Sequence, residues 1–362
     1  MDERTTWRGI HMNQIDNPMG TDGFEFIEYT ASDTRALEAL FLQMGFQASA
    51  KHRSKDVVLY QQGNINFIIN HEPDSFAQSF AAVHGPSCCA FAIRVKDARQ
   101  AYERALSLGA EPYHGKVGPM ELNIPAIRGI GNSLLYLVDR YEDGHTIYDV
   151  DFVKLEGSTE NYKGAGLLNI DHLTHNVHLG RMDQWAHFYE KLFNFREIRY
   201  FDITGKATGL KSRAMTSPCG KIRIPINEPS DQKSQIQEYL EAYNGEGIQH
   251  IALSTDDIYA SIDALRSNNI ELMDVPDTYY DMIDDRLPGH GEDLEELKKR
   301  RILIDGDLEN KQGLLLQIFT QTVIGPIFFE IIQRKGNQGF GEGNFRALFE
   351  SIERDQIKRG VI

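Results

Sequence analysis

Short apolar runs alternate with stretches of helical spacing along the chain, and the same order occurs twice. Continuous or alternating apolar positions predict strands, whereas apolar positions three and four residues apart predict one face of a helix. Each half contains two pairs of a strand followed by a helix. The pairs are residues 24–29 with 34–44 and 88–95 with 97–108 in the first half, and residues 170–174 with 182–192 and 248–255 with 257–267 in the second half. The chain is therefore predicted to consist of two similar halves, each made of two units.

Further strands close each half, and a polar segment separates the halves. These strands are residues 132–138 in the first half, and residues 314–319 and 327–333 in the second. Residues 156–166 are rich in Gly, Ser, Asn and charge, as is typical of an exposed linker. The repeat is longer than that of a solenoid. We predict an α+β fold with domains at residues 12–155 and 167–362, each a curved, mostly antiparallel sheet with helices outside.

Two parts of the second half are less regular. Residues 212–215 and 221–226 predict two strands joined by a turn that contains Pro and Gly. Residues 274–299 are acidic and contain several tyrosines, prolines and glycines. We expect them to form an irregular excursion that ends in a short helix over residues 292–300.

Composition excludes several classes of protein. The chain has 362 residues and a net charge of −15, with 41% hydrophobic and 25% charged residues. An acidic chain without a basic stretch is a poor candidate for binding nucleic acid or anionic membranes. Its apolar runs have the length of strands, too short to span a bilayer. Three cysteines do not make a disulfide framework, and no signal peptide is visible, so we expect a cytoplasmic protein that starts at Met1 or Met12.

One carboxylate interrupts an apolar strand near the C-terminus. Glu330 lies within the apolar run of residues 328–332. Burial of a lone carboxylate costs roughly several kcal/mol unless a cation or hydrogen-bond donors contact it. A glycine-rich turn follows, and an apolar stripe from Phe345 to Ile352 then predicts a helix that closes over the acid. The alternative is a core strand whose Glu forms an ordinary ion pair.

Two histidines sit singly on strands of the same half. His172 and His250 are 250 − 172 = 78 residues apart, and Glu330 follows after 330 − 250 = 80. These positions are equivalent in the two units of the second half, so they converge when the units pair. His175 lies three residues after His172 and therefore points to the opposite face. Two imidazoles and one carboxylate on one face are typical of non-haem Fe(II) oxygenases, whereas zinc more usually completes a tetrahedron.

The first half is an internal control for this metal site. Alignment of the repeats places Phe26 opposite His172, Ala90 opposite His250 and Tyr136 opposite Glu330. The first half is therefore predicted to be metal-free and structural. Each histidine alone is more simply explained as a hydrogen-bonded core residue, but the joint placement of all three groups favours the metal.

Several long motifs together resemble the 4-hydroxyphenylpyruvate dioxygenases of the vicinal-oxygen-chelate superfamily. The resemblance runs from about Gly20 to the C-terminus. Its most specific parts are residues 170–177, 225–229, 234–240, 247–252, 316–320, 329–334 and 339–345. It implies two domains, each built from two βαβββ modules that form a curved half-barrel.

The resemblance also implies chemistry and site residues. One Fe(II) per subunit would be held by His172, His250 and Glu330, for conversion of 4-hydroxyphenylpyruvate and O₂ to homogentisate and CO₂ in tyrosine and phenylalanine catabolism. A polar network near the substrate phenol would consist of Ser212, Asn227, Gln235 and Gln249. The remaining substrate-binding positions would be Gln317, Phe319, Phe328, Phe340, Asn344 and Phe345. Gln317 and Gln249 are the predicted catalytic residues, and we expect a homo-oligomer, either a dimer or a tetramer.

Three alternatives remain open. A 4-hydroxymandelate synthase would share the fold, the iron site and the substrate, but would hydroxylate the benzylic carbon. An extradiol ring-cleaving dioxygenase would use the same three ligands. A metal-free binding module of the same superfamily would lack the ligands, as the first half does.

Overall fold

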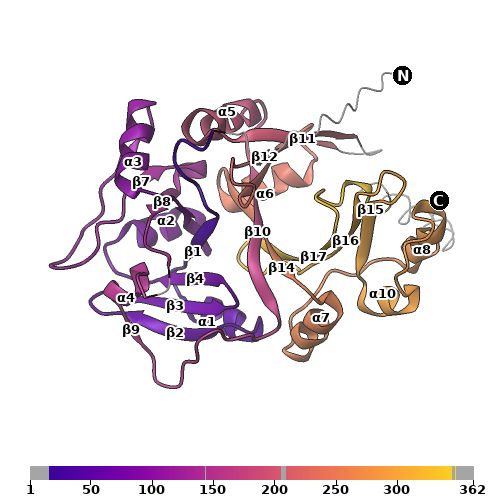
Figure 1. Ribbon diagram of the computed structural model, residues 1–362, viewed down its shortest axis with the longest axis horizontal. Helices are drawn as coiled ribbons and strands as arrows, with labels where there is room; N and C mark the ends of the chain where they lie inside the picture. Colours follow the sequence, from indigo (N-terminus) through magenta and orange to yellow (C-terminus); the bar gives the residue numbers. More distant parts are fainter. Residues whose placement is uncertain (1–15, 143, 205–208, 345–346, 348–362) are drawn as a thin grey trace.

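The computed structural model describes residues 16–142, 144–204, 209–344 and 347, and within them the chain forms two large sheets (Figure 1). The first sheet has nine strands in the order β6-β7-β8-β5-β1-β4-β3-β2-β9. Its strands are β1 (Phe24–Thr30), β2 (Gln47–His52), β3 (Val57–Gln62), β4 (Ile65–Asn70), β5 (Ser87–Arg94), β6 (Pro112–Tyr113), β7 (Ala126–Arg128), β8 (Leu134–Val138) and β9 (Phe152–Lys154). The helices of this half are α1 (Arg35–Gln43), α2 (Phe76–His84), α3 (Ala98–Ser107), the 3-10 helix η2 (Ile130–Asn132) and α4 (Ile147–Asp151).

The second sheet has eight strands in the order β11-β12-β13-β10-β14-β17-β16-β15. Its strands are β10 (Leu167–Asn176), β11 (Arg196–Thr204), β12 (Gly209–Thr216), β13 (Arg223–Pro229), β14 (Gly247–Thr255), β15 (Leu303–Asp307), β16 (Gly313–Phe319) and β17 (Phe328–Lys335). The helices are α5 (Met182–Phe193), α6 (Gln235–Tyr243), α7 (Ile258–Ser267), α8 (Asp277–Tyr280), α9 (Ile283–Arg286) and α10 (Leu294–Arg300).

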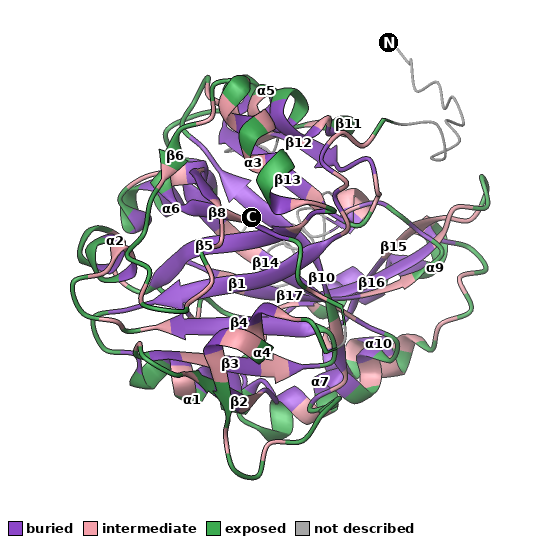
Figure 2. Ribbon diagram, turned by 60° about the vertical axis from the view of Figure 1, so that its left-hand side comes forward, coloured by how far each residue is buried: buried purple, intermediate pink, exposed green. Residues whose placement is uncertain are grey.

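The two sheets share one topology, which confirms the predicted repeat. In each half a central antiparallel pair, β1 with β5 or β10 with β14, is flanked on both sides by parallel neighbours. The outer pairs are antiparallel. The prediction of curved, mostly antiparallel sheets in an α+β fold is therefore confirmed. The central strands are buried on both faces, which explains their nearly continuous apolar runs (Figure 2).

Aromatic contacts join the two halves. The rings of Phe67 on β4 and Phe329 on β17 stack at 5.9 Å, and Phe91 on β5 lies 6.1 Å from His175 on β10. His84 at the end of α2 stacks on Tyr243 of α6 at 4.6 Å. Buried side chains of both halves form one continuous core. One face of each sheet is thus directed at the other half, which leaves the second face free to form a site.

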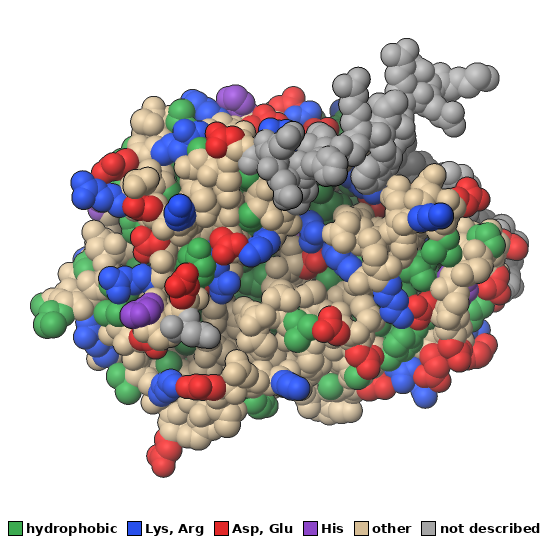
Figure 3. All heavy atoms as spheres, in the orientation of Figure 1, with side chains coloured by type: hydrophobic (Ala, Val, Ile, Leu, Met, Phe, Trp, Pro, Cys, Tyr) green, Lys and Arg blue, Asp and Glu red, His purple; other side chains and the backbone are tan. Residues whose placement is uncertain are grey.

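The segment that links the two halves lies at the molecular surface. Residues 156–164 are mostly exposed, and the domain limits stay a prediction. Lysine and arginine side chains are interspersed with acidic ones on the face shown in Figure 3. Within the described residues, no helix is long and apolar enough to cross a membrane.

Candidate metal centre

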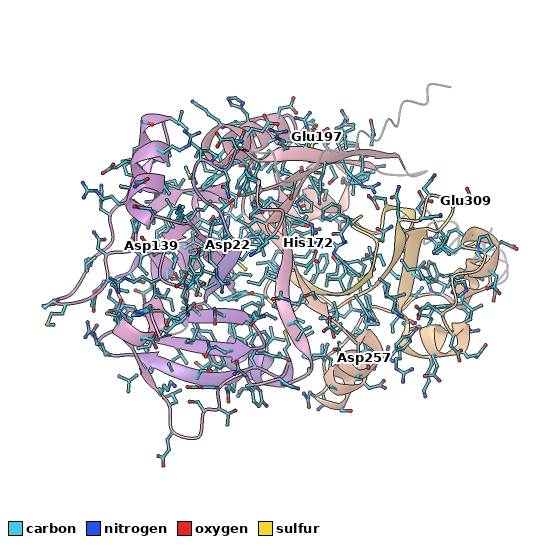
Figure 4. All side chains as sticks on the ribbon, viewed as in Figure 1. Asp22, Asp139, His172, Glu197, Asp257 and Glu309 are labelled. Atoms are coloured by element: carbon cyan, nitrogen blue, oxygen red, sulfur yellow. The ribbon has the colours of Figure 1, made fainter. Side chains whose placement is uncertain are left out.

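Three adjacent strands bring His172, His250 and Glu330 together. His172 on β10 and Glu330 on β17 both pair in register with Ala252 on the intervening strand β14. His250 precedes Ala252 by two residues and therefore shares its face. Ala252 is fully buried and small, so it leaves room between the larger side chains. Figure 4 shows His172 near the middle of the molecule, on β10.

The ligand atoms of the three side chains converge. Glu330 Oε2 lies 3.2 Å from Nε2 of His172 and 3.4 Å from Nε2 of His250, and the two nitrogens are 3.3 Å apart. The other carboxylate oxygen, Glu330 Oε1, is buried without a hydrogen-bond partner in the described part of the chain. Among the described residues, these three form the group of His, Cys, Asp and Glu side chains that is arranged to hold a cation. Two imidazoles, a carboxylate and an unpaired buried oxygen fit a divalent metal ion.

The residue before each histidine fixes the orientation of its ring. His172 donates from Nδ1 to Oδ1 of Asp171 at 2.8 Å, and His250 donates from Nδ1 to Oε1 of Gln249 at 2.8 Å. With the proton on Nδ1, each ring directs the lone pair of Nε2 into the site. Arg334 holds Asp171 in turn, with Nε and Nη2 each 2.8 Å from a carboxylate oxygen.

Buried charges in this cluster shift the pKa values of its members. Burial would raise the pKa of Glu330, but the two neighbouring imidazoles lower it to about 2. Burial would likewise raise the pKa of Asp171, but the hydrogen bonds from Arg334 and His172 hold it well below its ordinary value. Burial lowers the pKa of His250. For His172 burial is outweighed by Glu330 and Asp171, which raise its pKa because they favour positive charge at that point. A bound cation would supply such a charge.

A cavity opens beside the triad. The predicted positions that line it are Ser212, Asn227, Gln317, Phe319 and Phe340. Ser212 on β12 and Asn227 on β13 pair in register, and Phe340 packs edge-on against His172 at 5.3 Å. Phe319 lies edge-on to the His250 ring at 6.4 Å. The cavity therefore has polar groups on one wall and aromatic rings on another.

Of the other predicted positions, Phe328, Gln249 and Asn344 contact residues that form the triad or line the cavity. Phe328 stacks on the His250 ring at 4.9 Å, and Gln249 is engaged with His250. Asn344 is 1% exposed and donates from Nδ2 to Oε1 of Gln317 at 3.3 Å. Gln235 is exposed in the first turn of α6. Phe345 lies outside the described residues, and so does most of the predicted C-terminal helix.

Five further residues that are not among the predicted site positions line the cavity. They are Thr174, Phe201, Leu210, Pro225 and Glu342. Thr174 Oγ1 lies 3.0 Å from His250 Nε2. Strand alternation from His172 would have indicated Thr174, because residues two apart share a face. Phe201 and Leu210 carry no such signal, since they are ordinary apolar strand positions.

The equivalent face of the first half confirms the predicted alignment of the repeats. Phe26 and Tyr136 both pair in register with Ala92, as His172 and Glu330 do with Ala252. The two rings contact each other at 5.6 Å within a small apolar cluster. Ala90 occupies the position equivalent to His250, because it pairs with Glu28 and Leu134 as His250 pairs with Thr174 and Phe328.

His175 lies on the face of β10 that is directed at the first half, where its ring is 6.1 Å from that of Phe91. Its Nε2 is 2.7 Å from the hydroxyl of Tyr189, and its side chain is fully buried. Burial lowers the pKa of His175 to about 3. His172 and His175 thus face opposite sides of β10, as the alternation of the strand predicts.

Comparison with known proteins gives one consistent family. Residues 15–153 match the model described as the N-terminal domain of hydroxyphenylpyruvate dioxygenase, and residues 169–283 match the glyoxalase/bleomycin resistance protein/dioxygenase superfamily. The chain is 62% identical to hemolysin VllY of Vibrio vulnificus over 96% of its length and 98% of that protein. It is also 62% identical to 4-hydroxyphenylpyruvate dioxygenase of Pseudomonas aeruginosa, over 96% of this chain and 97% of the relative.

Solved structures agree with this assignment. A fusion protein of a xylose isomerase-like TIM barrel and 4-hydroxyphenylpyruvate dioxygenase matches 93% of the chain with a TM-score of 0.78 and 36% identity, and the chain spans 54% of that protein. A mutant of 4-hydroxymandelate synthase from Streptomyces coelicolor matches 94% of this chain and 100% of its own, with a TM-score of 0.79 and 25% identity. With the near full-length sequence identity, these matches show that the chain belongs to the hydroxyphenylpyruvate dioxygenase family, within the glyoxalase/bleomycin resistance protein/dioxygenase superfamily.

Proposed function

We propose that this enzyme binds Fe(II) through His172, His250 and Glu330 and converts 4-hydroxyphenylpyruvate and O₂ to homogentisate and CO₂, a step of tyrosine breakdown. The observation that carries the proposal is the buried triad, in which three ligand atoms from three neighbouring strands meet beside an aromatic cavity. Relatives with this activity in their names are 52–62% identical to the chain. The set of two imidazoles and one carboxylate favours Fe(II) over zinc because it leaves several coordination positions open.

The bound iron would supply redox chemistry that couples the 2-oxo acid and O₂. The protein's own residues then have three tasks. Phe319 and Phe340 line the cavity, and Phe328 stacks on the His250 ring, so these three rings would hold an aromatic substrate and exclude water from the reacting end. Their rings carry no hydroxyl group that a stray oxidant would readily attack. Gln317 adds a polar group to the cavity wall and, as the family resemblance implies, would face the substrate and the metal.

The opposite end of the cavity suits a phenol. Ser212 and Asn227 are both at most 9% exposed and lie side by side on β12 and β13. Asn227 donates from Nδ2 to Oδ1 of Asn176 at 3.4 Å, which leaves its carbonyl oxygen for another donor. A substrate hydroxyl can donate to this oxygen and accept from the Ser212 hydroxyl. Gln249 would act by orienting His250, and Gln235 stays a prediction from the sequence.

The test is anaerobic loading with Fe(II) and 4-hydroxyphenylpyruvate, followed by exposure to air and identification of the product. Homogentisate is the expected product, and its absence would refute the proposal. 4-Hydroxymandelate as the product would instead support the second candidate function, that of a 4-hydroxymandelate synthase. This candidate rests on the similarity to the solved structure of such an enzyme, with a TM-score of 0.79. Ring-cleaved products would indicate an extradiol enzyme.

Two substitutions test the ligand assignment. Glu330→Ala removes the anionic ligand, so the protein should fold but lose iron and turnover. His175→Ala is the matched control, because this histidine lies on the other face of β10 and should not affect iron binding. Iron loss in a folded His175→Ala protein, together with iron retention in His172→Ala, would reverse the assignment of faces. Homo-oligomerisation and a cytoplasmic location stay predictions from the sequence.

A further inference from the structure

Two short helices, α8 and α9, direct polar side chains at Gly343 and Asn344. Figure 1 shows α8 beyond the β15 edge of the second sheet. α8 carries Tyr279, whose hydroxyl lies 2.6 Å from Oδ1 of Asn344. α9 carries Arg286, which donates to the carbonyl of Gly343 at 3.0 Å and lies 3.3 Å from Asn344 Oδ1 through both Nη1 and Nη2. Tyr279 and Asn344 are each 1% exposed. These contacts belong to the acidic excursion over residues 274–299, for which the reaction itself gives no role.

The donors around Asn344 fix which way its amide points. Arg286 can only donate hydrogen bonds. The Tyr279 hydroxyl accepts from the backbone N–H of Ile304 at 2.9 Å and from Arg286 Nη2 at 2.9 Å, which occupies both of its lone pairs. Two acceptors lie within reach of its own hydrogen, the Ile304 carbonyl oxygen at 3.0 Å and Asn344 at 2.6 Å, and the shorter contact assigns the hydrogen to Asn344. Burial raises the pKa of Tyr279 to about 12, so the hydroxyl keeps that hydrogen at neutral pH. The atom of Asn344 that meets these donors must be its carbonyl oxygen.

The orientation of the Asn344 amide determines the orientation of the Gln317 amide in the cavity wall. Its NH₂ group is left to face Gln317 at 3.3 Å, and because an NH₂ group only donates, Gln317 must accept with Oε1. The Nε2 group of Gln317 is then the end available to the cavity, and within the described residues it has no protein acceptor. Gly341 allows this arrangement, since a Cβ at that position would fall 1.7 Å from Gln317 Oε1.

We infer that Tyr279 and Arg286 are positioning residues that hold the Gln317 amide with its NH₂ group toward the substrate. The inference rests on the proposed binding of a 2-oxo acid in the cavity. Such a substrate presents only hydrogen-bond acceptors at its reacting end, namely carboxylate and keto oxygens. A glutamine turned the other way would place its carbonyl oxygen against these oxygens. The hydrogen bonds from Tyr279 on α8 and Arg286 on α9 fix Asn344, and Asn344 in turn excludes that orientation of the glutamine.

Asn344→Asp and Asn344→Ala distinguish this role from simple packing. The carboxylate of Asn344→Asp still accepts from Tyr279 and Arg286 and remains ionised beside the arginine, so the segment keeps its anchor. It also accepts from Gln317, which must then turn and present Oε1 to the substrate. Asn344→Ala only releases the glutamine. We expect the Kd for 4-hydroxyphenylpyruvate to rise on the order of 10- to 100-fold for the Asp variant and about tenfold or less for the Ala variant.

A packing role predicts the opposite order, because Asp is nearly isosteric with Asn and Ala is not. The measurement is anaerobic titration of the Fe(II)-loaded full-length enzyme with 4-hydroxyphenylpyruvate, with iron content and thermal midpoint recorded for each variant. In a Gln317→Leu background the Asp and Ala substitutions at position 344 should bind the substrate equally. Tyr279→Phe combined with Arg286→Leu removes every donor to Asn344 Oδ1 and should behave as Asn344→Ala does in both backgrounds.

The outcomes separate the inference from the proposed function. A Kd for Asn344→Ala that equals or exceeds that of Asn344→Asp would overturn the positioning role, as would a difference between them that persists without Gln317. If Asn344→Asp does not fold, a substrate Kd of Tyr279→Phe with Arg286→Leu equal to that of the unsubstituted enzyme overturns the role by itself. Failure of the unsubstituted enzyme to bind or turn over 4-hydroxyphenylpyruvate would instead refute the proposed function.

Discussion

Asp171 should govern both the stability of the protein and its affinity for the metal, and Asp171→Asn tests this. The carboxylate accepts from His172 and Arg334 on Oδ1 and from Arg334 again on Oδ2, each at 2.8 Å. Arg223 Nη1 lies 3.4 Å from Oδ2. An Asn amide has the same shape but only one accepting end, so its NH₂ group must face a donor whichever way it is turned.

The structure sets the size of each effect. The side chains of Asp171 and Arg334 are 6% and 12% exposed, so the substitution leaves a buried guanidinium without its counter-charge. Loss of one partner of a buried ion pair costs about 3–5 kcal/mol. Loss of a charged hydrogen-bond partner behind a metal-bound imidazole weakens metal binding about 10- to 100-fold. His172 should therefore bind Fe(II) more weakly even in molecules that remain folded.

Two assays measure these effects independently. Urea unfolding of the metal-free protein at pH 7 gives the change in the free energy of unfolding, and anaerobic titration against a competing chelator gives the Kd for Fe(II). Asp183→Asn is the matched control, because the Asp183 side chain is 78% exposed in its ion pair with Arg213. The control should leave both quantities unchanged.

A double substitution separates the two roles of Asp171. Asp171→Asn with Arg334→Gln removes both charges, so much of the stability should return, whereas Fe(II) binding should stay weak because a neutral amide is a poorer acceptor for His172. Fe(II) affinity of Asp171→Asn within about threefold of the unsubstituted enzyme would refute the orientation of His172 by Asp171. An unchanged urea midpoint would refute the contribution of the ion pair to stability.

Three further predictions concern pH dependence and close backbone contacts. His175 takes up a proton near pH 6.5 when the chain is unfolded but only near its lowered pKa of about 3 when folded, so the free energy of unfolding should fall below pH 6.5, by about 2 kcal/mol at pH 5. His175→Gln should reduce this slope in urea titrations. Gly341→Ala should lower kcat/KM on the order of 100-fold, because its Cβ would collide with Gln317 and displace the cavity wall. Gly131→Ala should lower the urea midpoint and cost about 1–3 kcal/mol, because its Cβ would lie 1.8 Å from the carbonyl oxygen of Glu246 in the other half.

One control serves the two glycine substitutions, and His175→Gln serves the pH prediction. Gly289 also has a positive φ, of 80°, but has open space at its Cβ position, so Gly289→Ala measures the backbone strain alone. A Gly131→Ala variant no less stable than this control would mean that the two halves separate at that contact without cost. A pH slope that persists in His175→Gln would assign the titration to another group.

The metal ligands were predictable because they break the apolar pattern of buried strands. His172, His250 and Glu330 are polar groups in strands that are largely buried, and their positions in the repeat determine which residues pair across the strands. Phe201 and Leu210 were not predictable, since nothing in an apolar strand position tells which cavity it faces. Neighbouring strands are also not always consecutive along the chain, as the parallel pairing of β10 with β13 shows.

Short elements in the excursion were missed for a different reason. α8 and α9 have four residues each, too few for helical periodicity to appear. Their position depends on tertiary contacts, such as those of Tyr279 with Ile304 and of Arg286 with Gly343. Local propensity cannot encode contacts between residues that are far apart along the chain.

The two halves show which part of the site belongs to the fold and which to the metal. Glu25 precedes Phe26 as Asp171 precedes His172, and it too is buried and paired with an arginine, with Arg94 Nε at 2.5 Å. An acid at this strand position therefore does not require a metal. The pKa values nevertheless move in opposite directions: burial raises that of Glu25 against its single arginine, whereas that of Asp171 is lowered.

Because the folded protein disfavours the charge on Glu25, a neutral amide should be tolerated there. Glu25→Gln should change the free energy of unfolding by about 1 kcal/mol or less and should not alter Fe(II) binding, in contrast to Asp171→Asn. Urea unfolding and the chelator titration compare the two variants directly. Equal destabilisation would mean that the acid–arginine pair serves the fold alike in both halves, and the extra contacts of Asp171 with His172 and Arg223 would then contribute nothing to its charge preference.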